Sequence, residues 1–286
     1  MSLLLFAVSA VLTLIPFAPR AQNTTDPGMV VSLSWLRSHL DDKSVVVITT
    51  GSRAVYDRGH IPGARFIAHD DTIRMTGGAH YLLDPAALAP ALSKAGARDD
   101  ARIVLYGDSA MSTGWLYMTL ASIGHGAQVS ILDGNIDAWS AAGHPASTDV
   151  PAAATGRLTP AAAPGIVVDA PWVKAHLDDN MTRVIDSRTQ REWDAGHLPK
   201  ATLVLWEDLF SDLKLLTFKP KDQVRALFKQ AGVGDNSQVV TYCAIGMRAS
   251  LMYFAARYAG IPAQVYVGSF EDWQRQGGYP IVKGPV

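Results

Sequence analysis

The sequence contains one segment twice: Trp35-Leu-Arg-Ser-His-Leu-Asp-Asp42 returns as Trp172-Val-Lys-Ala-His-Leu-Asp-Asp179, at an offset of 137 residues. Further pairs keep this offset or drift slightly from it: Gly59-His-Ile-Pro62 with Gly196-His-Leu-Pro199, Val47-Ile48 with Val184-Ile185, Tyr106 with Tyr242, and Trp139 with Trp273. A solenoid repeat would have a much shorter period, of about 20–50 residues. The pattern therefore predicts two homologous domains.

The boundaries between these domains follow from composition. A stretch rich in Ala, Pro and Gly, residues 151–165, has little to bury and is typical of a linker. We expect domains at residues 24–150 and 166–286, and a total of 286 residues is an ordinary length for two domains.

Each half alternates short apolar runs with amphipathic stretches. Strands are predicted at residues 45–49, 102–106 and 129–132, and at 183–186, 238–242 and 263–267. Helices are predicted at residues 85–95 and 114–123, at 221–231 and 249–259, and after the N-cap residues Ser32 and Asp169. This alternation predicts an α/β fold, with a mostly parallel sheet in each domain and helices on both of its faces. Ligands of such sheets bind beyond the carboxyl ends of the strands.

The overall composition excludes several classes of protein. There are 25 Lys+Arg and 26 Asp+Glu residues, so no basic surface for nucleic acid is expected. A single cysteine excludes a disulfide framework, a Cys-rich zinc site and an iron–sulfur cluster. None of the eight histidines has a metal-binding spacing, so we expect neither a metal nor another cofactor.

The N-terminus is apolar. Residues 1–17 carry no charged side chain and are too few for a comfortable membrane span, which is typical of a secretory signal. We expect residues 1–23 to be a signal peptide or an N-terminal anchor. The mature chain would then be soluble in the periplasm or outside the cell, or held at the membrane if the segment is uncleaved. The alternative is a buried N-terminal helix.

The single cysteine stands where chemistry is expected. Cys243 follows the predicted strand 238–242 and precedes a tight loop and a helix. Loop amides and a helix N-terminus favour a thiolate, Gly246 gives the loop backbone freedom, and Arg248 adds a permanent charge for an anion. The alternative is a buried structural cysteine. The combination predicts an activated nucleophile beside an anion pocket.

Three motifs carry a resemblance to a known family. Tyr56-Asp-Arg-Gly-His-Ile-Pro-Gly-Ala-Arg-Phe-Ile67 fits the first signature of the rhodaneses, and residues 263–273 nearly match the C-terminal one, departing at Val267 and Asp272. The stretch Cys243–Arg248 matches the active-site pattern Cys-x-x-Gly-x-Arg/Thr. The chain thus resembles tandem-domain rhodaneses, the thiosulfate and 3-mercaptopyruvate sulfurtransferases, and in particular exported bacterial members.

The resemblance implies transfer of sulfur through a cysteine persulfide. Cys243 would take sulfur from thiosulfate or 3-mercaptopyruvate and pass it to cyanide or a thiol acceptor. The resemblance also implies that the loop stabilises the persulfide through Ala244, Ile245, Gly246, Met247 and Arg248. Gly107 stands at the equivalent position of the N-terminal half, so that half is expected to be inactive and to form one wall of the substrate cleft.

Other polar residues are candidates for binding the donor or for structural support. Arg188 is a candidate for binding the anionic donor, and Asp186 for structural support of the same strand end. His60 and His197 occur in both halves, including the one without a nucleophile, so they are interpreted as structural. Trp139 and Trp273 are interpreted as core residues.

Alternative functions stay open. Cysteine phosphatases need Cys-x5-Arg, whereas Arg248 follows Cys243 after four residues. A persulfide carrier or binding module with little turnover is the alternative outside enzymes. Among donors we favour thiosulfate, because Arg248 and Arg188 would offer positive charge to its sulfonate. Since no second thiol exists, any persulfide must be discharged to an external acceptor. The oligomeric state is not predicted.

Overall fold

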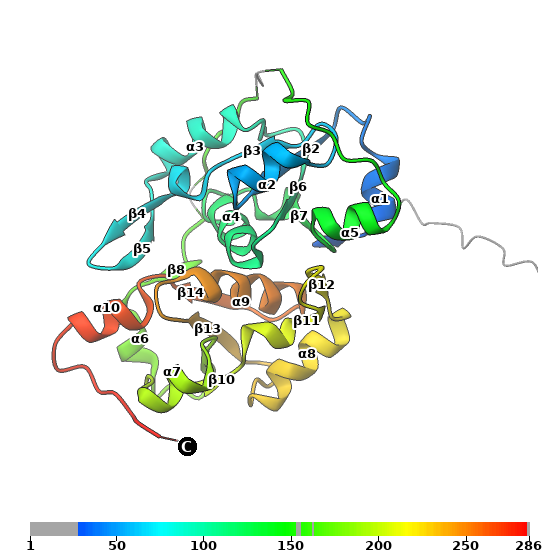
Figure 1. The fold of residues 1–286 in the computed structure, drawn as a ribbon. Helices are drawn as coiled ribbons and strands as arrows, with labels where there is room; N and C mark the ends of the chain where they lie inside the picture. The colour runs from blue at the N-terminus through cyan, green and yellow to red at the C-terminus, as the bar shows by residue number, and fades with distance from the viewer. Residues whose placement is uncertain (1–27, 153–155, 162, 285–286) are drawn as a thin grey trace, which may run out of the picture.

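The computed structural model describes residues 28–152, 156–161 and 163–284, which form two α/β domains (Figure 1). The N-terminal sheet has the order β1 (Val30–Val31), β7 (Val129–Leu132), β6 (Arg102–Gly107), β2 (Val45–Thr50), β3 (Arg65–Phe66). The C-terminal sheet has the order β8 (Val167–Val168), β14 (Ala263–Tyr266), β13 (Gln238–Tyr242), β9 (Thr182–Asp186), β10 (Thr202–Leu203). All neighbouring strands in both sheets are parallel, which confirms the predicted fold class.

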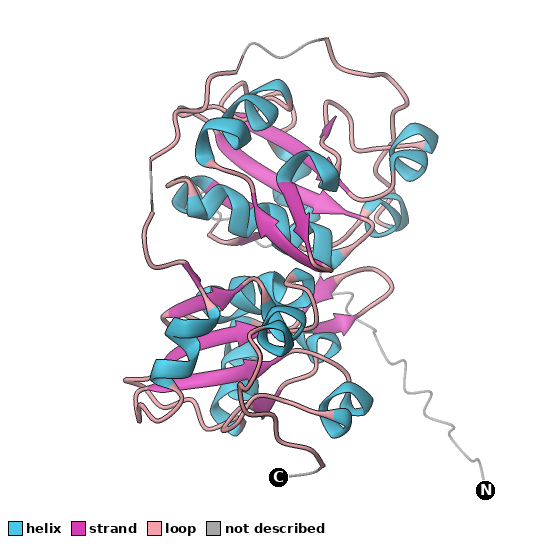
Figure 2. Cartoon of the chain, turned by 90° about the vertical axis from the view of Figure 1, so that its left-hand side faces the viewer, coloured by secondary structure: helices cyan, strands magenta, loops and turns pink. Residues whose placement is uncertain are grey.

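Helices cover both faces of each sheet (Figure 2). The N-terminal domain has α1 (Leu33–Ser38), α2 (Arg53–Arg58), α3 (Pro85–Lys94), α4 (Ala110–Ser122) and α5 (Ile136–Ala141). The C-terminal domain has α6 (Ala170–His176), α7 (Gln190–Ala195), α8 (Lys221–Gln230), α9 (Met247–Tyr258) and α10 (Ser269–Arg275). Short 3-10 helices lie at His69–Thr72, Gly126–Gln128 and Trp206–Leu209.

The strands bury both faces because successive side chains alternate between them. In β6, Val104 and Tyr106 pack in the cluster that contains Trp139 of α5, whereas Ile103 and Leu105 pack in the cluster that contains α4. The C-terminal sheet divides in the same way, with Trp273 on one side. Trp139 and Trp273 are fully buried, as predicted.

The two domains share one apolar core along α4 and α9. The cluster runs from Trp115 and Met118 on α4 to Leu251 and Phe254 on α9 without interruption. Gly114 permits this close approach, since a Cβ there would lie 2.6 Å from the Cα of Leu251. The interface is therefore built as tightly as a domain interior.

Two hairpins that the sequence did not reveal reach across the interface from opposite ends (Figure 1). The hairpin of β4 (Ile73–Thr76) and β5 (Ala79–Leu82) extends from the N-terminal domain to the loop after β13. The hairpin of β11 (Phe210–Asp212) and β12 (Thr217–Phe218) extends from the C-terminal domain to the loop before α5. Each domain thus covers a loop of the other.

Helix starts test the predictions in detail. The side chains of Ser32 and Asp169 accept hydrogen bonds from the amides of Trp35 and Trp172, so both predicted caps are confirmed. The helix predicted from residue 249 begins at Met247, because Gly246 takes the left-handed conformation that ends the loop.

The expected N-terminal signal or anchor, residues 1–23, lies outside the described residues. Among the helices within the described part of the chain, none has the length and hydrophobicity to cross a membrane.

Candidate active site

Cys243 follows β13 directly and lies at the carboxyl end of the C-terminal sheet. Its side chain is 1% exposed. Gly246 reverses the chain with φ +101°, and a Cβ there would lie 2.5 Å from the carbonyl oxygen of Val267. Only glycine fits this position, for conformational and steric reasons together. The loop therefore returns tightly enough to bring its own backbone to the sulfur.

Hydrogen bonds fix the sulfur and the loop. The Gly246 N–H points to the Cys243 Sγ at 3.1 Å, and the Cys243 N–H donates to the Ser269 Oγ at 3.1 Å. The amides of Phe270 and Glu271 donate to the carbonyl oxygens of Cys243 and Ala244, each at 3.0 Å. The first residues of α10, which lie in the C-terminal signature, therefore hold the backbone of Cys243 and Ala244 through hydrogen bonds.

Ser269 is a site residue that the sequence reasoning missed. It is fully buried and adopts φ +56°, which is uncommon for a residue with a side chain. Its hydroxyl accepts from the Cys243 amide and donates to the Tyr266 carbonyl at 2.9 Å. Its position directly after Gly268 in the C-terminal signature was the signal that could have identified it.

Arg248 is paired with a carboxylate that the sequence did not link to it. The Arg248 Nη1 and Nη2 donate to the two carboxylate oxygens of Glu192 at 2.6 and 2.7 Å. Hydrogen bonds from Arg248, helped by those from Thr189 and opposed by burial, lower the pKa of Glu192 to about 2. Burial opposes the charge of Arg248, yet its pairing with Glu192 and the nearby Cys243 sulfur raise its pKa. Arg248 thus faces the sulfur with its charge already compensated.

Arg188 and Asp186 form a buried ion pair at the carboxyl end of β9, next to the strand that precedes Cys243. The Arg188 side chain is 3% exposed, its Nε and Nη2 donate to Asp186, and Nη2 also donates to the Gly196 carbonyl at 2.6 Å. Asp186 also accepts from the Tyr242 hydroxyl, whose pKa burial and this carboxylate raise well above its usual value. These contacts favour structural support for both residues over the donor-binding role expected for Arg188.

The N-terminal domain covers the loop with an aromatic cluster. The His80 amide donates to the Ile245 carbonyl at 3.3 Å. The rings of His69, His80 and Trp115 lie 5.5–6.0 Å apart between centroids. Burial lowers the pKa of both imidazoles, so they are neutral near pH 7. The hydrogen bond and the three rings show that the two domains are in contact at the Cys243 loop. This contact explains why Cys243 is only 1% exposed.

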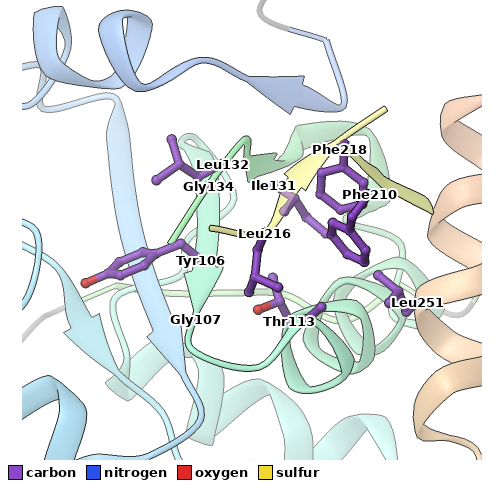
Figure 3. Close-up of a pocket in the computed structure, with 11 residues that line it drawn as sticks. Tyr106, Gly107, Thr113, Ile131, Leu132, Gly134, Phe210, Leu216, Phe218 and Leu251 are labelled. Carbon is purple, nitrogen blue, oxygen red and sulfur yellow. The ribbon is translucent and has the colours of Figure 1, made fainter. Parts of the chain in front are cut away.

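The equivalent loop of the N-terminal domain is closed. Gly107 stands where Cys243 stands in the other half, and a Cβ there would lie 2.4 Å from the Thr50 carbonyl oxygen. Leu216 of the opposite hairpin lines a small pocket over this loop, together with Tyr106 and Leu251 (Figure 3). A side chain of the other domain therefore lines the small space next to Gly107.

The repeated histidines have the structural role predicted from their repetition. His60 and His197 are each 1% exposed. Their Nδ1 atoms bond the carbonyl oxygens of Tyr56 and Trp193, and their rings stack on these same residues. Within the described ranges, no group of three or more His, Cys, Asp or Glu side chains is arranged to hold a metal ion.

Taken together, the fold and site define a class of protein: tandem α/β domains with one buried cysteine, whose sulfur accepts a hydrogen bond from an amide of the loop that follows it. The sequence profile of the rhodanese-like domain matches residues 32–142 and again 169–276. The chain therefore belongs to the rhodanese family, with two such domains in tandem.

Relatives with assigned names agree with this membership. A probable 3-mercaptopyruvate sulfurtransferase of Pseudomonas aeruginosa is 30% identical over 80% of this chain and 86% of its own length. The sulfur carrier protein TtuD of Thermus thermophilus is 27% identical over 90% of this chain and 98% of its own length. The crystal structure of SseA from Escherichia coli has a TM-score of 0.75 at 24% identity, over 85% of this chain and 99% of that one. The last comparison concerns the fold alone.

Proposed function

We propose that the protein is a sulfurtransferase that carries sulfur as a persulfide on Cys243. The observation that supports it most strongly is the 3.1 Å contact between the Gly246 N–H and the Cys243 Sγ, in a loop built against α9. An amide donor aimed at sulfur stabilises a thiolate and, after transfer, an anionic persulfide. The names of several relatives, which are sulfurtransferases or a sulfur carrier, support the same reaction.

The reaction has two balanced steps. With thiosulfate, the Cys243 thiolate attacks the outer sulfur, the S–S bond of the donor breaks, and sulfite leaves with the electron pair. With 3-mercaptopyruvate, the C–S bond breaks instead, and the pyruvate enolate that leaves takes up the thiol proton. In the second step a nucleophile such as cyanide attacks the terminal sulfur of the persulfide, and the Cys243 thiolate leaves.

The two arginines near Cys243 are both paired with carboxylates, and this pairing bears on the choice of donor. The preference for thiosulfate assumed that Arg188 and Arg248 offer uncompensated charge, but each is paired with a carboxylate. A dianion gains less from a compensated arginine than from a free one. We therefore propose that the preferred sulfur donor is 3-mercaptopyruvate, or another donor with a single negative charge, and not thiosulfate.

Steady-state thiocyanate formation with each donor tests this function. We expect turnover that Cys243→Ser abolishes without changing the thermal unfolding midpoint by more than a few degrees. One sulfur bound without turnover would favour the carrier alternative. Cys243-dependent hydrolysis of p-nitrophenyl phosphate would instead favour a phosphatase and contradict the proposal.

We also propose that the protein is exported, on the strength of its uncharged apolar N-terminus. N-terminal sequencing of the protein recovered from the periplasm or medium tests this, and recovery of the full chain from the cytoplasm alone would contradict it.

A further inference from the structure

The anion position on Arg248 is already occupied by a side chain of the protein. Glu192 and Arg248 meet through two parallel hydrogen bonds, which is the geometry in which a guanidinium binds any planar oxyanion. The pair is half-buried, with side-chain exposures of 16% for Arg248 and 33% for Glu192. An anionic donor that needs Arg248 must therefore displace this carboxylate or bind beside it.

Glu192 is held in this position from its other side. It closes a capping box at the start of α7, where the Thr189 amide and hydroxyl donate to its Oε2 at 3.0 and 2.7 Å. Four hydrogen bonds in total thus fix the carboxylate, which stays ionised at neutral pH. Displacing it from Arg248 would cost these contacts and leave a half-buried charge less well paired.

The charge balance at the sulfur follows from this pairing. A Cys243 thiolate, Arg248 and Glu192 together carry one negative charge, and Asp186 already compensates the nearby Arg188. A donor approaching the thiolate meets a site that is net negative. Each additional negative charge on the donor is penalised, and the low exposure of the sulfur limits screening by solvent.

We propose that Glu192 is a specificity-determining residue, which occupies the oxyanion position of Arg248 and makes the site select sulfur donors with one negative charge over dianionic donors. This proposal rests on the proposed function, and it assigns the choice of donor to a residue outside the Cys243 loop.

Glu192→Gln tests the proposal, because it keeps the shape of the side chain and removes its charge. We expect the ratio of kcat/KM for thiosulfate to kcat/KM for 3-mercaptopyruvate to rise by about tenfold or more. The matched control is Asp194→Asn, which also removes one carboxylate charge from α7, but at an exposed position where Asp194 accepts a hydrogen bond from Gln190; it should leave the ratio unchanged.

Two results would overturn the proposal. One is an unchanged donor ratio in Glu192→Gln, and the other is an equal fall in kcat/KM for both donors, which would mean that Glu192 only supports the loop.

A binding measurement separates this proposal from the proposed function. Sulfate, a dianion that cannot transfer sulfur, should raise the unfolding temperature of Glu192→Gln clearly more than that of wild type or Asp194→Asn. If all three proteins respond equally to sulfate, Glu192 does not prevent a dianion from binding to Arg248. This conclusion holds whether or not the protein turns over any donor.

Discussion

The loop after β13 and the loop after β6 occupy equivalent positions in the two domains but differ in every feature that chemistry requires. Cys243 and Arg248 of the first are replaced by Gly107 and Ser112 in the second, and Glu192 of α7, which pairs with Arg248, is replaced by Val55 of α2. The buried pair of Asp186 and Arg188 is replaced by Thr49 and Gly51. The N-terminal loop therefore lacks the nucleophile together with the groups that surround and support it.

The two hairpins differ in the same sense. Over the Cys243 loop, the N-terminal hairpin contributes a main-chain hydrogen bond and the ring of His80, and the 3-10 helix before it contributes the ring of His69. Over the Gly107 loop, the C-terminal hairpin contributes Leu216, and the carbonyl of Leu215 accepts from the Asn135 amide at 3.0 Å. Related elements thus cover one loop with polar groups and close the other with an apolar side chain. The comparison indicates that the N-terminal domain now serves as a cover for its partner.

Replacing Gly246 should have the largest effect on activity, because its left-handed conformation directs the loop amide at the sulfur of Cys243. In Gly246→Ala the new methyl group would meet the Val267 carbonyl at 2.5 Å in a left-handed conformation. We expect a loss of kcat/KM of about 100-fold or more, as for loss of one oxyanion donor, and a destabilisation of about 1–3 kcal/mol. Steady-state kinetics and denaturant unfolding measure both.

Gly63→Ala is the control for this variant. Gly63 is also left-handed, with φ +78°, but no other atom lies within 4 Å of its added Cβ. It should lose some stability and keep its activity. Equal kinetic losses in both variants would mean that the loop amide at Gly246 has no special role.

Removing Arg188 should show that the supporting ion pair is specific to the C-terminal domain. Arg188→Ala leaves Asp186 buried without its partner, and such losses typically cost about 3–5 kcal/mol. The exposed pair of Arg53 and Asp57 in the N-terminal domain gives the control, since Arg53→Ala should cost about 0–1 kcal/mol. Urea unfolding of both variants checks this. A near-wild-type stability of Arg188→Ala, with a raised KM for the donor, would restore the donor-binding role for that residue.

Restoring a cysteine to the N-terminal loop should not restore a second site. Gly107→Cys places a Cβ 2.4 Å from the Thr50 carbonyl and 2.8 Å from the Thr113 hydroxyl. We expect a destabilisation of about 1–3 kcal/mol from overpacking and no sulfur transfer when Cys243 is replaced by serine in the same chain. Measurable turnover by this double variant would contradict the view that the N-terminal loop is closed.

A fall in pH should weaken the contribution to folding stability of His69 and His80, which cover the Cys243 loop, but not that of Leu216, which lies over the Gly107 loop. The folded-state pKa values of His69 and His80 lie below the ordinary value of 6.5 because both rings are buried. Their neutral forms therefore favour the folded state above about pH 6.5, and this stability is lost as the pH falls and the unfolded chain binds more protons. Unfolding free energies measured between pH 7.5 and 5.5, within about this range of imidazole titration, should fall less in His69→Gln/His80→Gln than in wild type. Identical slopes would exclude this contribution.

Much of the molecule could be predicted because its signals are local. The strand and helix periodicity and the Cys243–Arg248 spacing each lie within a short window, and the repeat is found by comparing short segments with each other. The two predicted helix caps were confirmed. The pairing of Arg248 with Glu192 joins residues 56 positions apart, so no local window contains it. Thr189 followed by Glu192 did mark a capping box, but this pattern predicts only a helix start and says nothing of a distant arginine.

The hairpins escaped prediction for a related reason. Their strands are two to four residues long, and Gly77-Gly78 was the only strong turn signal in them. Their positions depend on contacts with the other domain, such as that of His80 with Ile245. The expected donor-binding role of Arg188 depended on the direction of its side chain, which only the fold determines.

The central claim is that one loop of two carries the transferred sulfur. The most direct measurement is the mass of the protein and its peptides after incubation with 3-mercaptopyruvate or thiosulfate, without an acceptor. We predict that the peptide containing Cys243 gains the mass of one sulfur atom, that cyanide removes it with formation of thiocyanate, and that Cys243→Ser gains nothing. An unmodified Cys243 peptide from protein that is turning over donor, or sulfur retained by Cys243→Ser, would contradict the claim.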